Sequence, residues 1–181
     1  MSSRTRYTRV AAALHWTIAL LILGLIAFGV LMTKEWMPNR FEIYQWHKSV
    51  GILVLVLSVA RLIWRLGHKP PPLPDSTPGW QAAVSHATHI AFYVLMIGMP
   101  LLGWAMVSAS PLPIPTVLFG VLPLPDLPLG ESEALADRFK SLHELGGKLF
   151  IALIALHIGA ALKHQFVDRD GLIARMSLRR G

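Results

Sequence analysis

The sequence contains no cysteine and few charged residues. Of its 181 residues, 15% are charged, against about 25% in a typical soluble domain. Without cysteine the chain cannot form disulfides, thiolate zinc sites, cysteine-ligated iron–sulfur clusters, or haem attached through a C-x-x-C-H motif. A metal would therefore need other ligands, and eight histidines are present. Because 54% of the residues are hydrophobic and the mean hydropathy is +0.51, lipid is the expected solvent for most of the surface.

Long uncharged runs predict four membrane-spanning helices. A span needs about 20 apolar residues, and residues 10–32 contain no Asp, Glu, Lys or Arg. The second span has a shorter uncharged centre, so Lys48 and Arg61 must extend toward the two head-group layers. Pro100 is expected to kink the third span. The sequence thus predicts an all-α integral membrane four-helix bundle, up-down-up-down, as a single domain over residues 1–181, with spans at residues 10–32, 46–66, 84–108 and 143–164.

Lysine and arginine are distributed unequally between the two ends of this predicted bundle. Eleven of the 17 lie in the N-terminal segment, the connection after the second span and the C-terminal tail. With acidic residues included, the two ends carry net charges of +8 and −1. Since Lys and Arg are enriched in cytoplasmic connections, both termini are predicted to be cytoplasmic. The basic residues are then expected to set the membrane orientation and to attract anionic lipid, and no nucleic-acid partner is expected.

The longest connection, residues 109–142, lies at the external end. It starts with a Pro-rich hydrophobic segment and is predicted to end in a short helix over residues 132–142. It is interpreted either as a cap over the external end of the bundle or as a passive loop.

Histidines lie at two depths along the predicted helices. His47 and His143 occupy the external ends of the second and fourth spans. His15 lies in the first turns of the first span. His157 follows His143 by 14 residues, which is about 21 Å along an α-helix and close to four turns, so both point from nearly the same face. An outer and an inner histidine layer result.

Two imidazoles at one depth on facing helices suit an iron porphyrin with two axial ligands, a ligation that favours electron transfer over oxygen binding. Gly51, Gly146 and Gly147 are expected to leave room for the flat macrocycle. Zinc fits less well, because each layer lacks a third and fourth ligand. Alternatively, the histidines and glycines only join helices.

For the inner layer, the sequence does not decide which histidine is the partner of His15. His86 and His89 share a face near the start of the third span, so either could replace His157 as the partner of His15. If they do not, they are free to bind porphyrin carboxylates or a second substrate.

Short motifs follow one another in a specific order along the chain. They are Leu14-His15-Trp16, Trp46-His47-Lys48-Ser49-Val50-Gly51, Ala60-Arg61-Leu62, a Pro-rich loop at residues 70–74, His86-x-x-His89 with Tyr93, His143-Glu144, His157, Ala160-Ala161-Leu162-Lys163-His164, and Arg175-Met176. The ordered set resembles the bacterial cytochrome b561 family, four-helix dihaem b proteins of the inner (plasma) membrane, over nearly the whole chain. The resemblance implies two noncovalent haem b groups, one ligated by His15 and His157 and the other by His47 and His143.

The resemblance also implies a reaction, because part of this family oxidises superoxide and reduces ubiquinone. Near the cytoplasmic end, four residues are expected to bind quinone oxygens or haem propionates: His89, His164, Arg61 and Lys163. Arg61 and Lys163 could instead serve only as topology anchors.

At the external end, cations near the outer histidines are expected to attract superoxide: Lys48, Lys148, Arg138 and Lys140. The alternative function is a cytochrome b subunit that carries electrons between quinone and a partner redox protein such as a hydrogenase.

Overall fold

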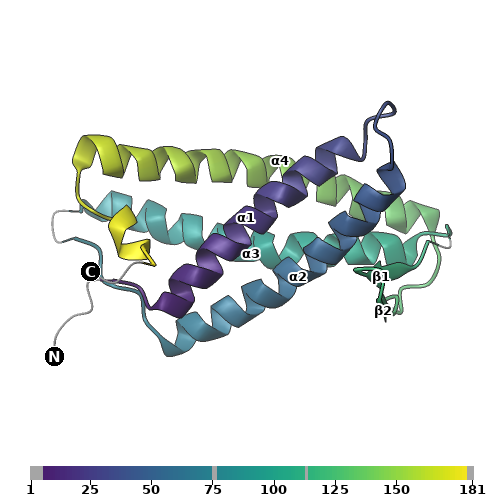
Figure 1. Ribbon diagram of the computed structural model, residues 1–181, viewed down its shortest axis with the longest axis horizontal. Coiled ribbons are helices and arrows are strands. Elements are labelled where there is room, and N and C mark those ends of the chain that lie inside the picture. Colours follow the sequence, from purple (N-terminus) through teal and green to yellow (C-terminus); the bar gives the residue numbers. More distant parts are fainter. Residues whose placement is uncertain (1–5, 75–76, 113, 179–181) are drawn as a thin grey trace.

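Each apolar run folds as one long helix. The structure is a computed structural model that describes residues 6–74, 77–112 and 114–178. Its long helices are α1 (Arg9–Leu31), α2 (Arg40–Gly67), α3 (Gly79–Ala109) and α4 (Glu133–Lys163) (Figure 1). All four are long and apolar enough to cross a membrane. The predicted membrane four-helix bundle is therefore confirmed.

The bundle has an apolar exterior as well as an apolar core. The core contains Ile18, Val54 and Phe150. Large apolar side chains also point outward, for example Leu20 and Leu156, which are 68% and 71% exposed. Such a surface would be unfavourable in water, but it suits acyl chains.

The helices α2, α3 and α4 are longer than the predicted spans, whereas α1 has the predicted length. α2 and α3 begin several residues earlier than predicted, at Arg40 and Gly79. The short helix predicted over residues 132–142 is not separate, because it continues into the fourth span as α4. Ser132 caps this helix, its Oγ accepting a hydrogen bond from the backbone N–H of Leu135 at 3.3 Å. Pro100 lies inside α3, which continues on both sides of it.

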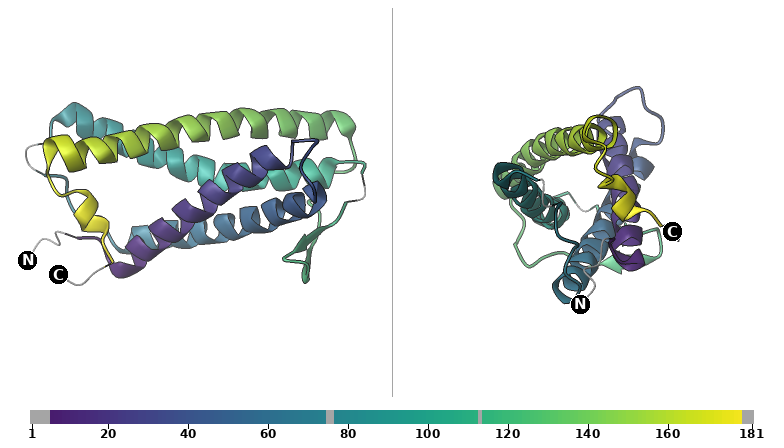
Figure 2. Two further views of the ribbon diagram at one scale, coloured as in Figure 1. Left: turned by 45° about the horizontal axis from the view of Figure 1, so that its top comes forward. Right: turned by 90° about the vertical axis from the view of Figure 1, so that its left-hand side faces the viewer.

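The helices pack as neighbours in chain order. α1 packs on α2, α2 on α3 and α3 on α4, whereas α4 makes hardly any close backbone contacts with α1 or α2. Figure 2 shows α3 and α4 together on one side of the bundle and α1 and α2 on the other. The space between these two helix pairs is bridged by side chains, and the histidines are among them.

The first and last described segments meet at one end of the bundle, which we call the terminal end. After α4, a π-helical turn η1 (His164–Asp168) and a 3₁₀ turn η2 (Ile173–Met176) fold back toward the start of α1. The backbone N–H of Tyr7 donates to the Arg175 carbonyl at 3.1 Å. Trp16, next to His15, donates from Nε1 to the Met176 carbonyl at 3.0 Å.

The opposite end, which we call the hairpin end, carries a β-hairpin that the sequence analysis missed. Strands β1 (Thr116–Leu118) and β2 (Leu122–Leu124) pair antiparallel, with Thr116 opposite Leu124. The turn places Phe119 and Gly120 at positive φ, 52° and 71°. Gly120 adopts this conformation at little cost, which allows the tight reversal.

Two buried serines attach this connection to the bundle in the same way. Ser49 of α2 donates from Oγ to the Gln45 carbonyl and accepts from the backbone N–H of Phe119 at 2.9 Å. Ser108 of α3 donates from Oγ to the Trp104 carbonyl and accepts from the backbone N–H of Leu127 at 3.0 Å. The connection is therefore tied to α2 at the turn of the hairpin and to α3 just after β2.

Candidate functional site

The outer histidines face each other across the space between α2 and α4. The ring centroids of His47 and His143 are 6.2 Å apart, with an interplanar angle of 73°. Nδ1 of His143 lies 3.1 Å from the Met99 carbonyl. Because a carbonyl only accepts, this contact places the proton on Nδ1 and leaves Nε2 as the nitrogen for a metal. The buried Nδ1 of His47 has no partner at hydrogen-bond geometry among the described residues, although the Leu25 backbone on α1 interacts with this imidazole.

The inner layer repeats this geometry near the terminal end. The ring centroids of His15 and His157 are 6.3 Å apart, with an interplanar angle of 69°. His89 of α3 has the same centroid distance and angle to His157. His157 is thus common to both candidate pairs, which argues against its replacement by His89 or His86.

The His15–His157 pair and the His89–His157 pair both have the spacing that one shared metal requires. An imidazole nitrogen binds a transition metal at about 2.0 Å, so two rings on opposite sides of one ion have their centres about 6 Å apart. The pairs differ in the room between their helices. His89 lies on α3, which packs directly on α4, whereas His15 lies on α1, which does not. A flat macrocycle therefore fits between His15 and His157 better than between His89 and His157.

Of the glycines expected to leave room for a macrocycle, Gly51 faces open space and Gly146 does not. A Cβ at Gly146 would collide with Sδ of Met99, so this glycine serves the packing of α3 on α4. Gly51 faces no described atom within 4 Å. Two further glycines, which lie beside the outer histidines, were missed. A Cβ at Gly29 or Gly103 would lie 3.5 or 3.4 Å from Cε1 of His47 or His143, respectively.

Arg61 lies among the inner histidines. It is close enough to His15, His89 and His157 to interact with all three electrostatically. A second arginine, not singled out from the sequence, lies nearby: Cζ of Arg65 is 5.9 Å from the ring centroid of Tyr93, and Arg65 also interacts with His89. Haem propionates or a quinone oxygen would find cationic partners here.

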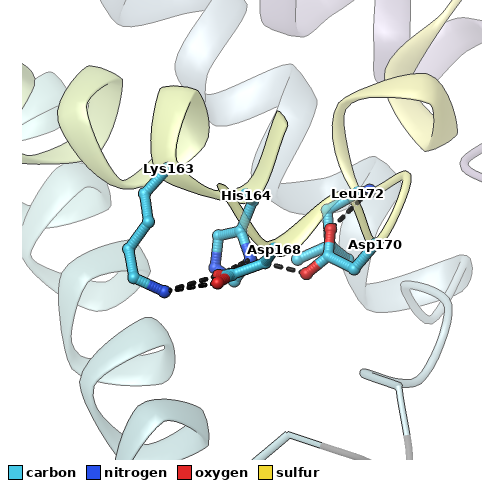
Figure 3. Close-up of polar contacts among 5 residues, drawn as sticks. All are labelled: Lys163, His164, Asp168, Asp170 and Leu172. Atoms are coloured by element: carbon cyan, nitrogen blue, oxygen red, sulfur yellow. Dashed lines mark hydrogen bonds and ion pairs between the residues drawn. The ribbon is translucent and has the colours of Figure 1, made fainter. Parts of the chain in front are cut away.

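His164 and Lys163 form a second polar group at the end of α4 (Figure 3). Nδ1 of His164 is 2.6 Å from Oδ2 of Asp170 and 3.2 Å from Oδ2 of Asp168. Lys163 donates to both oxygens of Asp168, at 2.7 and 2.6 Å. Asp170 is itself held, because its Oδ1 accepts from the backbone N–H of Leu172 at 3.1 Å. The two aspartates were not recognised from the sequence, since the π-helical turn that brings them back to His164 has no clear sequence signal.

The carboxylates could also be considered as ligands for a cation, since one ligand atom of each of His164, Asp168 and Asp170 lies within 4.8 Å of the others. The Lys163 ammonium already supplies positive charge to Asp168. We therefore interpret the arrangement as a histidine hydrogen-bonded to carboxylates and not as a metal centre.

The external cations are spread around the hairpin end. Lys48 donates from Nζ to the Pro115 carbonyl at 2.9 Å and lies 4.9 Å from the centroid of the Tyr44 ring. Lys140 lines a shallow cleft of about 180 Å³ together with Tyr44 and Asp137. Arg138, also on the first turns of α4, and Lys148, further along it, are exposed. The structure thus places Lys48 and Lys140 near one ring, Tyr44, and the other two cations on the surface of α4.

Known proteins with similar sequences agree with this architecture. Residues 6–177 match the family described as prokaryotic cytochrome b561. The chain belongs to the prokaryotic cytochrome b561 family. It is 33% identical to cytochrome b561 homolog 2 of Escherichia coli (strain K12), over 94% of this chain and 90% of that protein. Cytochrome b561 homolog 1 of the same strain is 32% identical, over 97% and 98%. A protein of Yersinia pestis named probable superoxide oxidase CybB is 27% identical, over 94% and 95%.

Family membership confirms the resemblance seen in the sequence motifs. As a cytochrome b561, the chain is a multi-pass protein of the bacterial inner membrane that binds haem b and transfers electrons. The histidine pairs supply the donor set such a cofactor needs.

Proposed function

We propose that this cytochrome b561 holds two haem b groups and transfers electrons from superoxide at the hairpin end to ubiquinone at the terminal end. The observation that carries the proposal is the repeated geometry of the two histidine pairs, whose ring centroids are 6.2 and 6.3 Å apart at two depths of one bundle. When bound, the haem groups supply one-electron transfer along the bundle. In balance, two superoxide ions, one quinone and two protons give two oxygen molecules and one quinol.

Four histidines would hold these groups: His47 and His143 in the outer layer, His15 and His157 in the inner layer. The Met99 carbonyl fixes the tautomer of His143 and so presents Nε2 to the metal. On this assignment His89 stays free beside His157, with Arg61 and Arg65 close to it, as a partner for a propionate or a quinone.

The terminal end must also deliver two protons for each quinol. His164 suits this task, because its Nδ1 bonds to the carboxylate of Asp170 while the second ring nitrogen can exchange a proton with a quinone oxygen. Lys163 and Asp168 beside it keep the cluster charged and solvated. Following the excess of basic residues, we place the terminal end in the cytoplasm, which would supply the protons.

Superoxide is a small anion, so local positive charge would raise its rate of encounter. Lys48 lies near the Tyr44 ring and Lys140 lines a cleft together with Tyr44, and Arg138 and Lys148 add exposed charge along α4. The similarity to the Yersinia pestis protein named probable superoxide oxidase supports this choice of donor.

Stopped-flow mixing of the oxidised, haem-loaded protein with superoxide tests the proposal. Haem reduction faster than spontaneous dismutation of superoxide, followed by reoxidation on addition of a ubiquinone analogue, is the expected result. If superoxide reduces no haem while a copurifying redox enzyme does, the chain is an electron-transfer subunit, and the superoxide reaction must be abandoned.

A further inference from the structure

The β-hairpin at the hairpin end presents apolar side chains that the described part of the bundle leaves largely exposed. Val121 at its turn is 83% exposed and Leu122 is 60% exposed. Phe119, also in the turn, keeps about half of its surface exposed. No Asp, Glu, Lys or Arg occurs in the connection from residue 109 to residue 125. A charge-free, apolar tip is an unusual surface to leave in water.

Contacts with α2 determine the depth of this hairpin. The backbone N–H of Phe119 donates to Oγ of Ser49 at 2.9 Å, and the Phe119 ring packs edge-on against Trp46, with centroids 5.8 Å apart. Ser49 is nine residues into α2, about 14 Å along the helix from its outer end. The turn therefore lies beside the interior part of α2 and not above the end of the bundle.

The level of Trp46 to Ser49 has the properties of a membrane interface. Lys48 is the last charged residue of α2 before the uncharged run 49–60, and its ammonium bonds to the Pro115 carbonyl. Trp46 is half exposed on the outer surface of the helix. Tryptophan with a neighbouring lysine is typical of the boundary between head groups and acyl chains.

The orientation of the hairpin fits the same location. Figure 2 shows it extending sideways from the bundle, across the helix direction and not along it. A two-stranded ribbon has unpaired edge groups and cannot lie in the hydrocarbon core. At the interface these groups still reach water, and Pro123 in β2 removes one edge N–H altogether.

From this register we infer that the hairpin inserts Phe119, Val121 and Leu122 into the lipid leaflet at the hairpin end, at the boundary between head groups and acyl chains. The occupant of this apolar surface is lipid, because the Phe119 ring packs on Trp46, which is itself half exposed on the outside of α2. Insertion would also act on the outer histidine layer. The connection bonds to Lys48 through Pro115 and to Ser49 through Phe119, and these are the two residues after His47. The leaflet would therefore hold the connection against this layer.

The absence of cysteine makes a direct test possible. In Val121→Cys the new thiol is the only one in the chain and can carry an environment-sensitive fluorophore. The labelled protein is studied in nanodiscs that contain one chain each, with phospholipids bearing a nitroxide either near the head group or near the end of the acyl chain. We expect a loss of fluorescence that is larger with the shallow nitroxide, and little loss with aqueous iodide.

Glu131→Cys provides the matched control, because this exposed residue follows in the same connection and should be quenched by iodide. Leu122→Cys repeats the test if Val121→Cys does not retain haem. Iodide quenching at residues 121 and 122 as strong as at residue 131, without quenching by lipid nitroxide, would overturn the inference. Shielding that appears only with several chains in one nanodisc would also overturn it and would assign the surface to a second copy.

Discussion

A single backbone contact determines how His143 can act. Its Nδ1 donates to the Met99 carbonyl on α3, so the imidazole is oriented from outside its own helix, and Nε2 is left without this proton. His157 lies four turns further along the same helix, with Phe92 5.1 Å from its ring. On the proposed assignment, one helix therefore contributes a ligand to each layer, and the two layers should be removable separately.

His143→Ala should lose the outer haem and keep the inner one, and His157→Ala should do the reverse. Pyridine-haem analysis is expected to give about half of the parent haem content in each variant. The two reduced spectra should differ, because different haems remain. Loss of one haem from His89→Ala, with both haems retained in His157→Ala, would transfer the inner ligand to α3.

Gly103 limits the space beside His143. A Cβ at this position would lie 3.4 Å from Cε1 of the imidazole, which an alanine can just accommodate and a leucine cannot. Gly103→Leu should therefore lower the occupancy of the outer haem, and Gly103→Ala should leave it nearly unchanged. Gly159→Leu, at an exposed position on α4, controls for bulk in a span. Full haem loading of Gly103→Leu would contradict the claim that a glycine is needed here to leave space beside His143.

Asp170 is expected to act through His164. Asp170→Asn keeps an oxygen for the backbone N–H of Leu172 but removes the carboxylate from Nδ1 of His164. Quinone reduction should slow by about tenfold or more, while haem spectra and reduction by superoxide stay as in the parent. Asp168→Asn should have the smaller effect, because Asp168 pairs mainly with Lys163. Equal effects of both variants would indicate a general role of charge and not a role of this pair.

Among the elements, the connection between α3 and α4 depends on two serines used in the same way. Each satisfies its hydroxyl proton on its own helix and uses its oxygen for a backbone N–H of the connection. The connection is thus held by protein hydroxyl groups, whose hydrogen bonds lipid acyl chains cannot replace. Removal of either oxygen leaves a backbone N–H without its partner, at a cost of about 1–3 kcal/mol.

Ser49→Ala should loosen the hairpin without unfolding the bundle. Hydrogen exchange of the Phe119 amide is expected to become about tenfold faster, as the loss of one hydrogen bond implies. Ser58→Ala is the matched control on the same helix, because its buried hydroxyl has no partner among the described residues. Unchanged exchange at Phe119 would show that ring packing on Trp46 alone holds the hairpin.

At the scale of the whole molecule, the helices and the histidine layers were predictable because both depend on patterns along one helix. Uncharged runs predict spans, and the 14-residue interval between His143 and His157 predicts a shared face. The hairpin was not predictable in this way, since short strands of Leu, Val and Pro have the composition of an irregular loop. Asp168 and Asp170 were missed because they approach His164 only through the π-helical turn. The sequence left open whether His86 or His89 replaces His157 as the partner of His15, because the distances between helices depend on packing that the sequence does not contain.

The charge of the hairpin end gives the last prediction. Although this end is net negative by sequence, Lys48 directly follows His47 of the outer layer, and Lys48 and Lys140 both lie near Tyr44. Attraction of superoxide to them should be screened as salt rises, because the Debye length is only about 10 Å at 0.1 M ionic strength. The second-order rate of haem reduction by superoxide should therefore fall between low and high salt.

Arg138→Gln combined with Lys140→Gln should lower this rate at low salt and flatten its salt dependence. Arg9→Gln combined with Lys69→Gln removes the same charge at the terminal end and should change neither, because on the proposed function superoxide is captured at the other end of the bundle. Lys48 is left intact in this comparison, since its ammonium also holds the Pro115 carbonyl and its loss would move the hairpin. A salt dependence that both double variants share equally would mean that the total charge of the molecule, and not this group of cations, attracts the substrate.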